Sequence, residues 1–387
     1  MMSTLRVDAI RHNSATSDAI TTHSDGTCTA KITGMTGGGT FTNRNKIING
    51  DFTIHQRGGT IASSSGVYTL DRWRAYRTGD SSGGFSVQQS LSSYPQTNIS
   101  GVIDNFKSSA LITVTSAGSA AANNNCKFQQ RIEGSHVYDL AFGTAVAKKV
   151  TVSFYVKCSL TGNFGVALVN GSHNRSNVQL YTVNSANTWE RKTVTFDGDT
   201  SGTWAFNTGT GLQLMFDMGS GSSKHAGSTN TWLSGEYHGT TSSVKLIHTN
   251  GATIQFTGVQ LEEGSVATSF EFRNYADELL RCYRYYYRMQ GEDNKTYMIG
   301  MSDNDNVNIY GFFHFPVPMR VPPSSIEQNG TASHYKVRRD TIQKVVLLFL
   351  LLLILGFFIV ELISHHQVMD GELDRCYGAK VVVQVVT

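Results

Sequence analysis

The stretch Ile254–Arg288, IQFTGVQLEEGSVATSFEFRNYADELLRCYRYYYR, contains the change of pattern that decides how this chain folds. Apolar and polar residues alternate up to Leu261, which predicts a β-strand. After Asn274 the apolar residues recur at helical spacing instead, and Asn274 itself is suited to be the N-cap of a helix. The stretch therefore predicts the last strand of a β domain, followed by a helix that packs one face on that domain.

Upstream of this stretch, short alternating segments recur between breaks rich in Gly, Asn and Ser. The clearest is Val150–Lys157, in which every second residue from Val150 to Val156 is apolar. About ten such segments precede Asn274, and none has a comparably strong helical period. Strands with one apolar face each bury that face when two sheets stack. The sequence predicts an all-β fold, an antiparallel jelly-roll sandwich.

Composition narrows the classes of function. The formal net charge of +3 is too small to indicate a nucleic-acid partner. The five cysteines are far apart and form no metal-binding pattern. Asp197 and Asp199 have a spacing that calcium ligands use, but a role in a turn is favoured. No motif for a P-loop, a nucleophilic serine or a zinc protease is present, so we expect no catalytic residue, no metal and no cofactor.

These patterns divide the chain into five segments. Residues 1–44 have no room for a core and are expected to be an N-terminal attachment segment. Residues 45–272 are predicted to form the jelly roll, and residues 273–290 a linking helix. Residues 291–340, interrupted by four prolines near their middle, are predicted to be a small, incomplete β module. Residues 341–387 are predicted to contain an apolar helix and a tail.

Several strings in the chain resemble the tail-fibre and other structural proteins of tailed bacteriophages. NKIINGDFTIHQRGG (45–59), YTLDRW (68–73) and GVQLEEGSVAT (258–268) carry this resemblance together, and HFPVPMR (314–320) follows the helix as it does in that family. STLRVDAI (3–10) is similar to the segment by which such fibres join the particle.

The resemblance implies a virion component of a phage tail that is not an enzyme, with a jelly roll similar to carbohydrate-binding modules. It further implies a homotrimer that recognises a host-surface glycan and contacts other tail proteins through its N-terminal segment. Two alternatives stay open: a membrane-anchored glycan-binding protein with a C-terminal tail anchor, and a polysaccharide depolymerase. The depolymerase is disfavoured because the sequence has no β-helix repeat.

The resemblance is lost near the apolar run Val345–Val360, VVLLFLLLLILGFFIV. This run is shorter than the ~20 residues that span a bilayer. We favour a change of reading frame that replaced the native C-terminus, because the upstream pattern ends abruptly. A transmembrane anchor is the second explanation, since basic residues precede the run.

Sugar binding requires flat aromatic surface beside polar groups that bind hydroxyls. Trp204, Trp232 and Tyr237 lie in Gly-, Ser- and Asn-rich segments predicted to be loops, and they are the candidate carbohydrate-binding residues. Trp73 and Trp189 lie next to predicted strands and are expected to pack in the core or at its rim. Loops of a sandwich also bury aromatic residues as plugs, and this second explanation is favoured for the three candidates.

Overall fold

The structure is a computed structural model whose main body lies between residues 43 and 289. The residues that it describes are 43–63, 65–79, 83–95, 105–119 and 121–289, with short segments at 9–11, 19–22, 24, 28–30, 300–302, 309–311, 314–323, 326–327, 336–339, 342–345, 347–352, 358–363 and 383–385.

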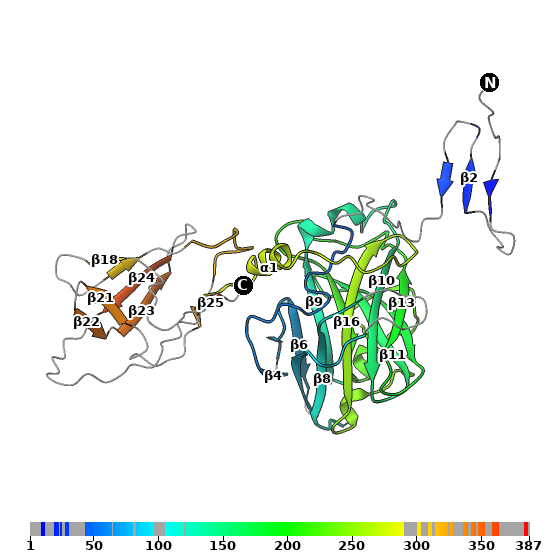
Figure 1. The fold of residues 1–387 in the computed structure, drawn as a ribbon. Helices are drawn as coiled ribbons and strands as arrows, with labels where there is room; N and C mark the ends of the chain where they lie inside the picture. Colours follow the sequence, from blue (N-terminus) through cyan, green and yellow to red (C-terminus); the bar gives the residue numbers. More distant parts are fainter. Residues whose placement is uncertain are drawn as a thin grey trace.

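Two antiparallel sheets stack face to face (Figure 1). The six-stranded sheet has the order β13 (Glu190–Phe196), β10 (Val150–Cys158), β16 (Thr253–Glu263), β8 (Ser109–Ser116), β7 (Gly84–Ser90) and β4 (Thr60–Ala62). The seven-stranded sheet has the order β15 (Trp232–Ser234), β12 (Arg175–Val183), β11 (Gly162–Asn170), β14 (Thr210–Asp217), β9 (Asn125–Glu133), β6 (Trp73–Thr78) and β5 (Val67–Tyr68). Most connections from β8 onward cross between the sheets, as in a jelly roll. The predicted antiparallel jelly-roll sandwich is confirmed.

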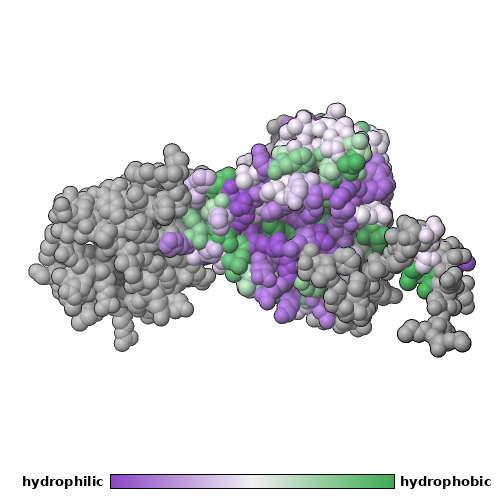
Figure 2. Space-filling view, turned by 90° about the horizontal axis from the view of Figure 1, so that it is seen from above, coloured by the Kyte–Doolittle hydropathy of each residue, from purple (hydrophilic) through white to green (hydrophobic). Residues whose placement is uncertain are grey.

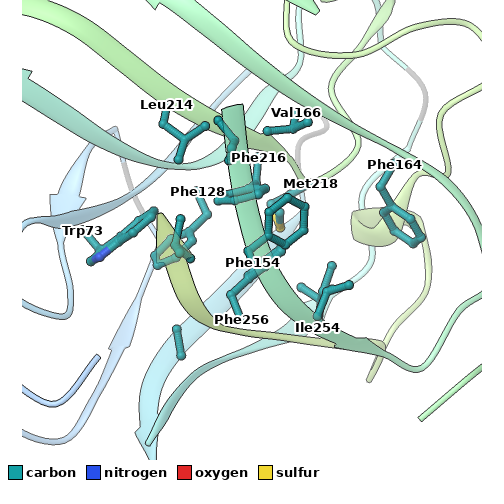
Figure 3. Close-up of a cluster of buried hydrophobic side chains, with 14 of the residues drawn as sticks. Trp73, Phe128, Phe154, Phe164, Val166, Leu214, Phe216, Met218, Ile254 and Phe256 are labelled. Atoms are coloured by element: carbon teal, nitrogen blue, oxygen red, sulfur yellow. The ribbon is translucent and has the colours of Figure 1, made fainter. Parts of the chain in front are cut away.

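Aromatic rings fill the space between the two sheets (Figure 3). Phe216 of β14 and Phe256 of β16 come from opposite sheets, and their ring centroids lie 4.4 Å apart. Trp73 and Phe128 stack at 4.9 Å beside them. All four side chains are fully buried. Burying one such ring contributes ~2–3 kcal/mol to folding, so these contacts are a main source of the cohesion between the sheets.

The outward side of the six-stranded sheet is covered by other parts of the chain. The alternation in β10 predicts polar residues on that side, which would suit a surface exposed to solvent. Thr151 and Tyr155 of β10 point to that side and are buried. Phe106 packs against Tyr155 and against Phe270, with ring centroids 5.3 Å apart in both pairs. The segment that follows β16 therefore folds back over this sheet and closes its outer surface.

The segment between residues 43 and 56 is held to the sandwich by Asn49, which has a left-handed φ of +57°. Its side chain accepts from the N–H of Ile54 at 2.9 Å and donates to the carbonyls of Ile54 and Asp71 at 2.9 and 3.0 Å. Its own carbonyl accepts from the indole N–H of Trp73 at 3.0 Å. An asparagine suits this position because it tolerates the left-handed region and satisfies several buried backbone groups.

Helix α1 spans Tyr275–Tyr283, which is shorter than the predicted helix at 273–290. It begins after the predicted N-cap, since the Asn274 side chain accepts from the N–H of Ala276 at 3.0 Å. In Figure 1 this helix lies between the sandwich and the C-terminal strands.

The buried face of α1 differs from the predicted apolar stripe. Glu278 and Cys282 are its buried residues, whereas Leu280 is 40 % exposed. Glu278 lies inside because its carboxylate accepts a hydrogen bond from the backbone N–H of Asn49 and pairs with Arg273 at 3.2 Å. A buried carboxylate needs such partners, and the chain supplies one from just before α1, Arg273, and one from far away in sequence, Asn49.

The apolar helix predicted within residues 341–387 is wrong for the part that the structure describes. Leu347–Leu352 (β23) and Phe358–Ile363 (β24) form an antiparallel pair. An uninterrupted apolar run has neither the helical nor the strand period, so periodicity cannot separate the two. Phe, Ile and Val favour strands, and Gly356 divides the run. Within the described residues, no helix has the length and apolar character needed to cross a membrane.

The remaining described strands are short and form small sheets. They are β1 (Ala9–Ile10), β2 (Ile20–Thr22), β3 (Cys28–Ala30), β17 (Arg288–Met289), β18 (Gly300–Ser302), β19 (Ile309–Gly311), β20 (Ile326–Glu327), β21 (Lys336–Arg339), β22 (Ile342–Val345) and β25 (Val383–Val385). The first three pair with one another inside the predicted attachment segment.

Candidate functional site

The outward surface of the seven-stranded sheet carries a polar strip across three neighbouring strands. Alternation along β9 turns Phe128 and Gln130 toward the core, and turns Lys127, Gln129 and Arg131 outward. The register of β9 with β6 and β14 adds residues beside them on the same side. We call this strip the outer face, and it consists of Arg74, Tyr76, Lys127, Gln129, Arg131 and Gln213.

A loop between β14 and η4 (Leu246–His248) covers the neighbouring part of the sheet and borders the outer face. Its Ala226 and Tyr237 pack with Leu233 of β15 against an apolar cluster on the sheet. Residues of β11, β12 and β14 make up that cluster: Ala167, Val169, Val178 and Met215. The cluster holds the loop in place, so the border of the outer face has a defined position.

Glu236 of this loop binds three basic side chains at the border. Lys127 pairs with its carboxylate, Lys224 lies 2.8 Å from it, and the Nδ1 atom of His173 lies 3.1 Å from it. Burial by itself would raise the pKa of Glu236, but hydrogen bonds from His173, Lys127 and Lys224 and the charge of Lys127 hold it far below its usual range. Burial lowers the pKa of Lys127 to about 8, against the opposing effect of Glu236.

Tyr76 presents an aromatic ring on the outer face, and two cations lie close to it. The Nζ atom of Lys127 is 4.9 Å from the ring centroid, and the guanidinium carbon of Arg74 is 5.3 Å from it. The ring is half-buried. Cation–π contacts at this range fix the orientation of the ring. Tyr76 can therefore offer a rigid apolar edge and a phenolic hydroxyl to a ligand.

Gln129 lies in the middle of the outer face, directly opposite Arg74 of β6 and Met215 of β14. Its side chain is fully buried, and neither its amide oxygen nor its amide nitrogen has a hydrogen-bond partner. The next residue, Gln130, is also buried but exchanges two hydrogen bonds with the backbone of Ile48, at 2.9 and 2.7 Å. A buried amide without partners costs ~1–3 kcal/mol, so Gln129 is an unfavourable choice for folding alone.

A buried cluster of a serine, a histidine and an aspartate in this region has the residue types of a catalytic triad but not its geometry. Ser220 and Asp217 both approach the Nδ1 atom of His238, at 3.4 and 3.2 Å, while its Nε2 atom lies 3.1 Å from Asn125. A relay needs the nucleophile and the carboxylate on different ring nitrogens. All four residues are buried. The group is therefore arranged to tie the loop to the sheet rather than to activate the serine.

The structure separates the three candidate binding residues. Trp204 is 7 % exposed, and its ring meets Trp232 at 5.4 Å and Phe142 at 4.8 Å, both in T-shaped contacts. The indole N–H of Trp232 donates to the carbonyl of Asp197 at 2.7 Å. Both tryptophans pack on the main core, and Trp232 lies in strand β15 rather than in a loop. Tyr237 lies on the opposite side of the seven-stranded sheet, in the loop that borders the outer face.

The two aspartates with calcium-like spacing bind basic side chains. Asp199 is buried and accepts from the Nε atom of Arg175 at 2.8 Å, and Asp197 pairs with Lys149. Over the described part of the chain, no three His, Cys, Asp or Glu side chains are grouped as a metal ion would require.

No protein-family description and no curated protein sequence matches the chain. Among solved structures, the enzymatically active domain of tailspike protein 4 of bacteriophage CBA120 is 12 % identical, with a TM-score of 0.30, over 57 % of this chain and 22 % of that one. The C-terminal family 22 carbohydrate-binding module of Clostridium thermocellum Xyn10B is 11 % identical, with a TM-score of 0.27, over 58 % and 96 %. The family 11 module of the same organism, in complex with a β-1,3-1,4-mixed-linked tetrasaccharide, is 10 % identical, with a TM-score of 0.25, over 55 % and 98 %. A likeness of this size concerns the fold alone.

Sequence reasoning missed the outer face. The string NCKFQQRIE of β9 does contain a signal, because Lys, Gln and Arg occupy alternate positions opposite Phe, Gln and Ile. That string does not show which residues of β6 and β14 lie beside it on the outer face, because this depends on how the strands pair.

Proposed function

We propose that this chain is a virion protein of a phage tail that binds a host-surface glycan without cleaving it, and that the outer face of its jelly roll holds the saccharide. The observation that carries the proposal is the half-buried ring of Tyr76, which lies on the outer face between the cations of Lys127 and Arg74. Amides, guanidinium groups and an aromatic ring are the groups that recognise sugar hydroxyls and sugar rings.

Two further observations support the glycan as ligand. The surface of the sandwich seen from above is largely hydrophilic, with smaller hydrophobic patches (Figure 2). Glu236 and its three basic partners also place charged and polar side chains along one border of the outer face. A ligand with many hydroxyl groups matches such a surface better than an apolar ligand does.

The role in a phage tail rests on the resemblance of the strings at 45–59, 68–73 and 258–268. In that role residues 1–44 join other tail proteins, and the chain acts as a homotrimer. Light scattering of the full chain should then give three times 42.3 kDa. An antibody against the chain should label the tails of purified particles, and labelling confined to membranes of the host would contradict the proposal.

A glycan array probed with the full chain tests the binding function. Tyr76→Ala should weaken binding of the best glycan about tenfold or more, because an aromatic contact worth ~1.4 kcal/mol is lost. Tyr138→Ala is the matched control, since Tyr138 is 66 % exposed and lies outside the outer face. Equal binding by the two variants would refute the assignment of the outer face. Release of reducing ends from the bound polysaccharide would refute binding without cleavage.

A further inference from the structure

At one end of the outer face lies a small cavity of about 70 Å³. Arginine and tyrosine side chains dominate its walls, and we call it the arginine pocket: Arg57, Arg72, Arg131, Arg320, Tyr285 and Tyr286. Arg131 also belongs to the outer face. The pocket and the outer face are therefore continuous through that side chain.

The arginine pocket has a strong excess of positive charge. Its single acidic lining residue is Glu133, which accepts two hydrogen bonds from Arg284, at 2.7 and 3.0 Å. Burial would raise the pKa of Glu133, but the hydrogen bonds of Arg284 outweigh burial and lower it to about 2. The negative charge of Glu133 is thus compensated by Arg284, which does not line the pocket. None of the four lining arginines has an ion-pair partner among the described residues.

Two of these arginines have buried N–H groups without an acceptor. They are the Nη1 group of Arg57 and the Nε group of Arg72. The flat faces of the two guanidiniums lie over tyrosine rings, 3.6 Å from the centroid of Tyr286 and 3.4 Å from that of Tyr285. Stacking holds a guanidinium by its face and leaves its N–H edge available for an acceptor.

The backbone at Arg72 is strained in a way that places its side chain in the pocket. Arg72 has a φ of +71°, in a turn closed by a 2.8 Å hydrogen bond from the N–H of Trp73 to the carbonyl of Leu70. A residue with a Cβ pays ~1–2 kcal/mol in this region. Strain of this kind persists where the surrounding structure enforces it, and it is concentrated at binding sites.

We propose that the arginine pocket binds the anionic group of an acidic saccharide, a carboxylate or a sulfate, while the rest of the saccharide lies on the outer face. This inference rests on the proposed glycan-binding function and adds the class of ligand. A carboxylate or sulfate oxygen accepts charge-assisted hydrogen bonds from guanidinium edges, and Arg57 and Arg72 each present a buried N–H group that has no acceptor. The cavity volume suits one such group rather than a whole sugar ring.

Calorimetric titration of the full chain with matched ligands tests the inference. The probes are trigalacturonate with its methyl ester, and 6-O-sulfated lactose with lactose. The wild-type chain should bind at least one anionic probe tenfold or more tightly than its neutral counterpart. Arg57→Gln should remove that preference and change binding of the neutral probe less than twofold, because it deletes a charge-assisted donor. Arg191→Gln on β13 removes the same charge from the other sheet and should change nothing.

The outcomes separate this inference from the function on which it rests. Equal affinity of the wild-type chain for both members of each pair would overturn the acidic-saccharide inference and leave glycan binding intact. A preference that persists in Arg57→Gln would also overturn it. If the full chain binds no glycan on the array and none of the four probes, both proposals fail together. The comparison of anionic and neutral probes on the wild-type chain needs no variant, so it holds even where a variant fails to fold.

Discussion

Replacing Gln129 with methionine should stabilise the protein and leave glycan binding nearly unchanged. The Gln129 side chain is fully buried and its amide has no hydrogen-bond partner. Methionine has nearly the same length and volume, and it removes both polar atoms. Met215 lies directly opposite in β14, so the new thioether meets an apolar neighbour.

The expected gain follows from the cost of the buried amide. A buried polar group without a partner costs ~1–3 kcal/mol, and an apolar group of the same shape does not carry that cost. We expect the free energy of unfolding to rise by about 2 kcal/mol. With a urea m-value of about 3 kcal/mol/M, this raises the unfolding midpoint by roughly 0.7 M. The Gln129 amide is fully buried and cannot contact a ligand, so glycan affinity should stay within about twofold.

Gln130→Met provides a control at the next residue of the same strand. The Gln130 amide exchanges two hydrogen bonds with the backbone of Ile48, so its loss leaves two buried backbone groups unpaired. This variant should lower the free energy of unfolding by ~2–4 kcal/mol. Urea unfolding followed by tryptophan fluorescence measures both variants. A destabilisation of Gln129→Met similar to that of Gln130→Met would refute the reasoning, since it would mean that the Gln129 amide has partners.

Three further predictions concern pH and the core. Burial, then the charges of Arg57 and Arg288, lower the pKa of His55 to about 4. Between pH 6.5, the pKa of His55 in the unfolded state, and pH 4, the unfolded state binds a proton at His55 and the folded state does not. The urea unfolding midpoint should therefore fall as the pH is lowered from 7 to 4. His55→Gln should make the midpoint less dependent on pH, and an unchanged pH dependence would contradict the role of His55. Asn49→Ala should lower the unfolding free energy by ~3–5 kcal/mol, because three buried hydrogen bonds are lost; a loss under 1 kcal/mol would contradict that role. Trp204→Ala should cost ~3–5 kcal/mol while the folded protein keeps its glycan affinity within twofold; a selective loss of affinity would instead support the predicted loop site.

Local patterns predicted much of the fold. The period-two alternation of Val150–Lys157 identified strand β10, and Asn274 was identified as the N-cap of α1. The apolar run after Val345 was misread because a segment without polar residues has no period to read. The buried face of α1 was also misread, since Glu278 lies inside only through partners at Asn49 and Arg273.

The candidate site was predicted less well than the fold. Trp204 and Trp232 were candidate binding residues in predicted loops, with burial as aromatic plugs the favoured explanation, and they do pack against each other on the main core. Composition shows that an aromatic residue lies in a polar segment, and it does not show whether the segment turns that residue inward. Tyr237 lies beside the outer face, in the loop that covers part of the sheet. Its role in binding stays a prediction.

The amino-acid sequence by itself determined that this chain builds two stacked sheets followed by a capped helix, because alternation and capping depend on residues within a few positions of one another. Only the tertiary structure decided which residues lie together in the proposed site. Strand register placed Tyr76 beside Lys127 and Arg74 beside Gln129, and the turn at Arg72 brings its guanidinium onto the ring of Tyr285, more than two hundred positions away. Such sites depend on contacts between segments that are far apart along the chain, and a local sequence pattern does not specify which distant segments meet.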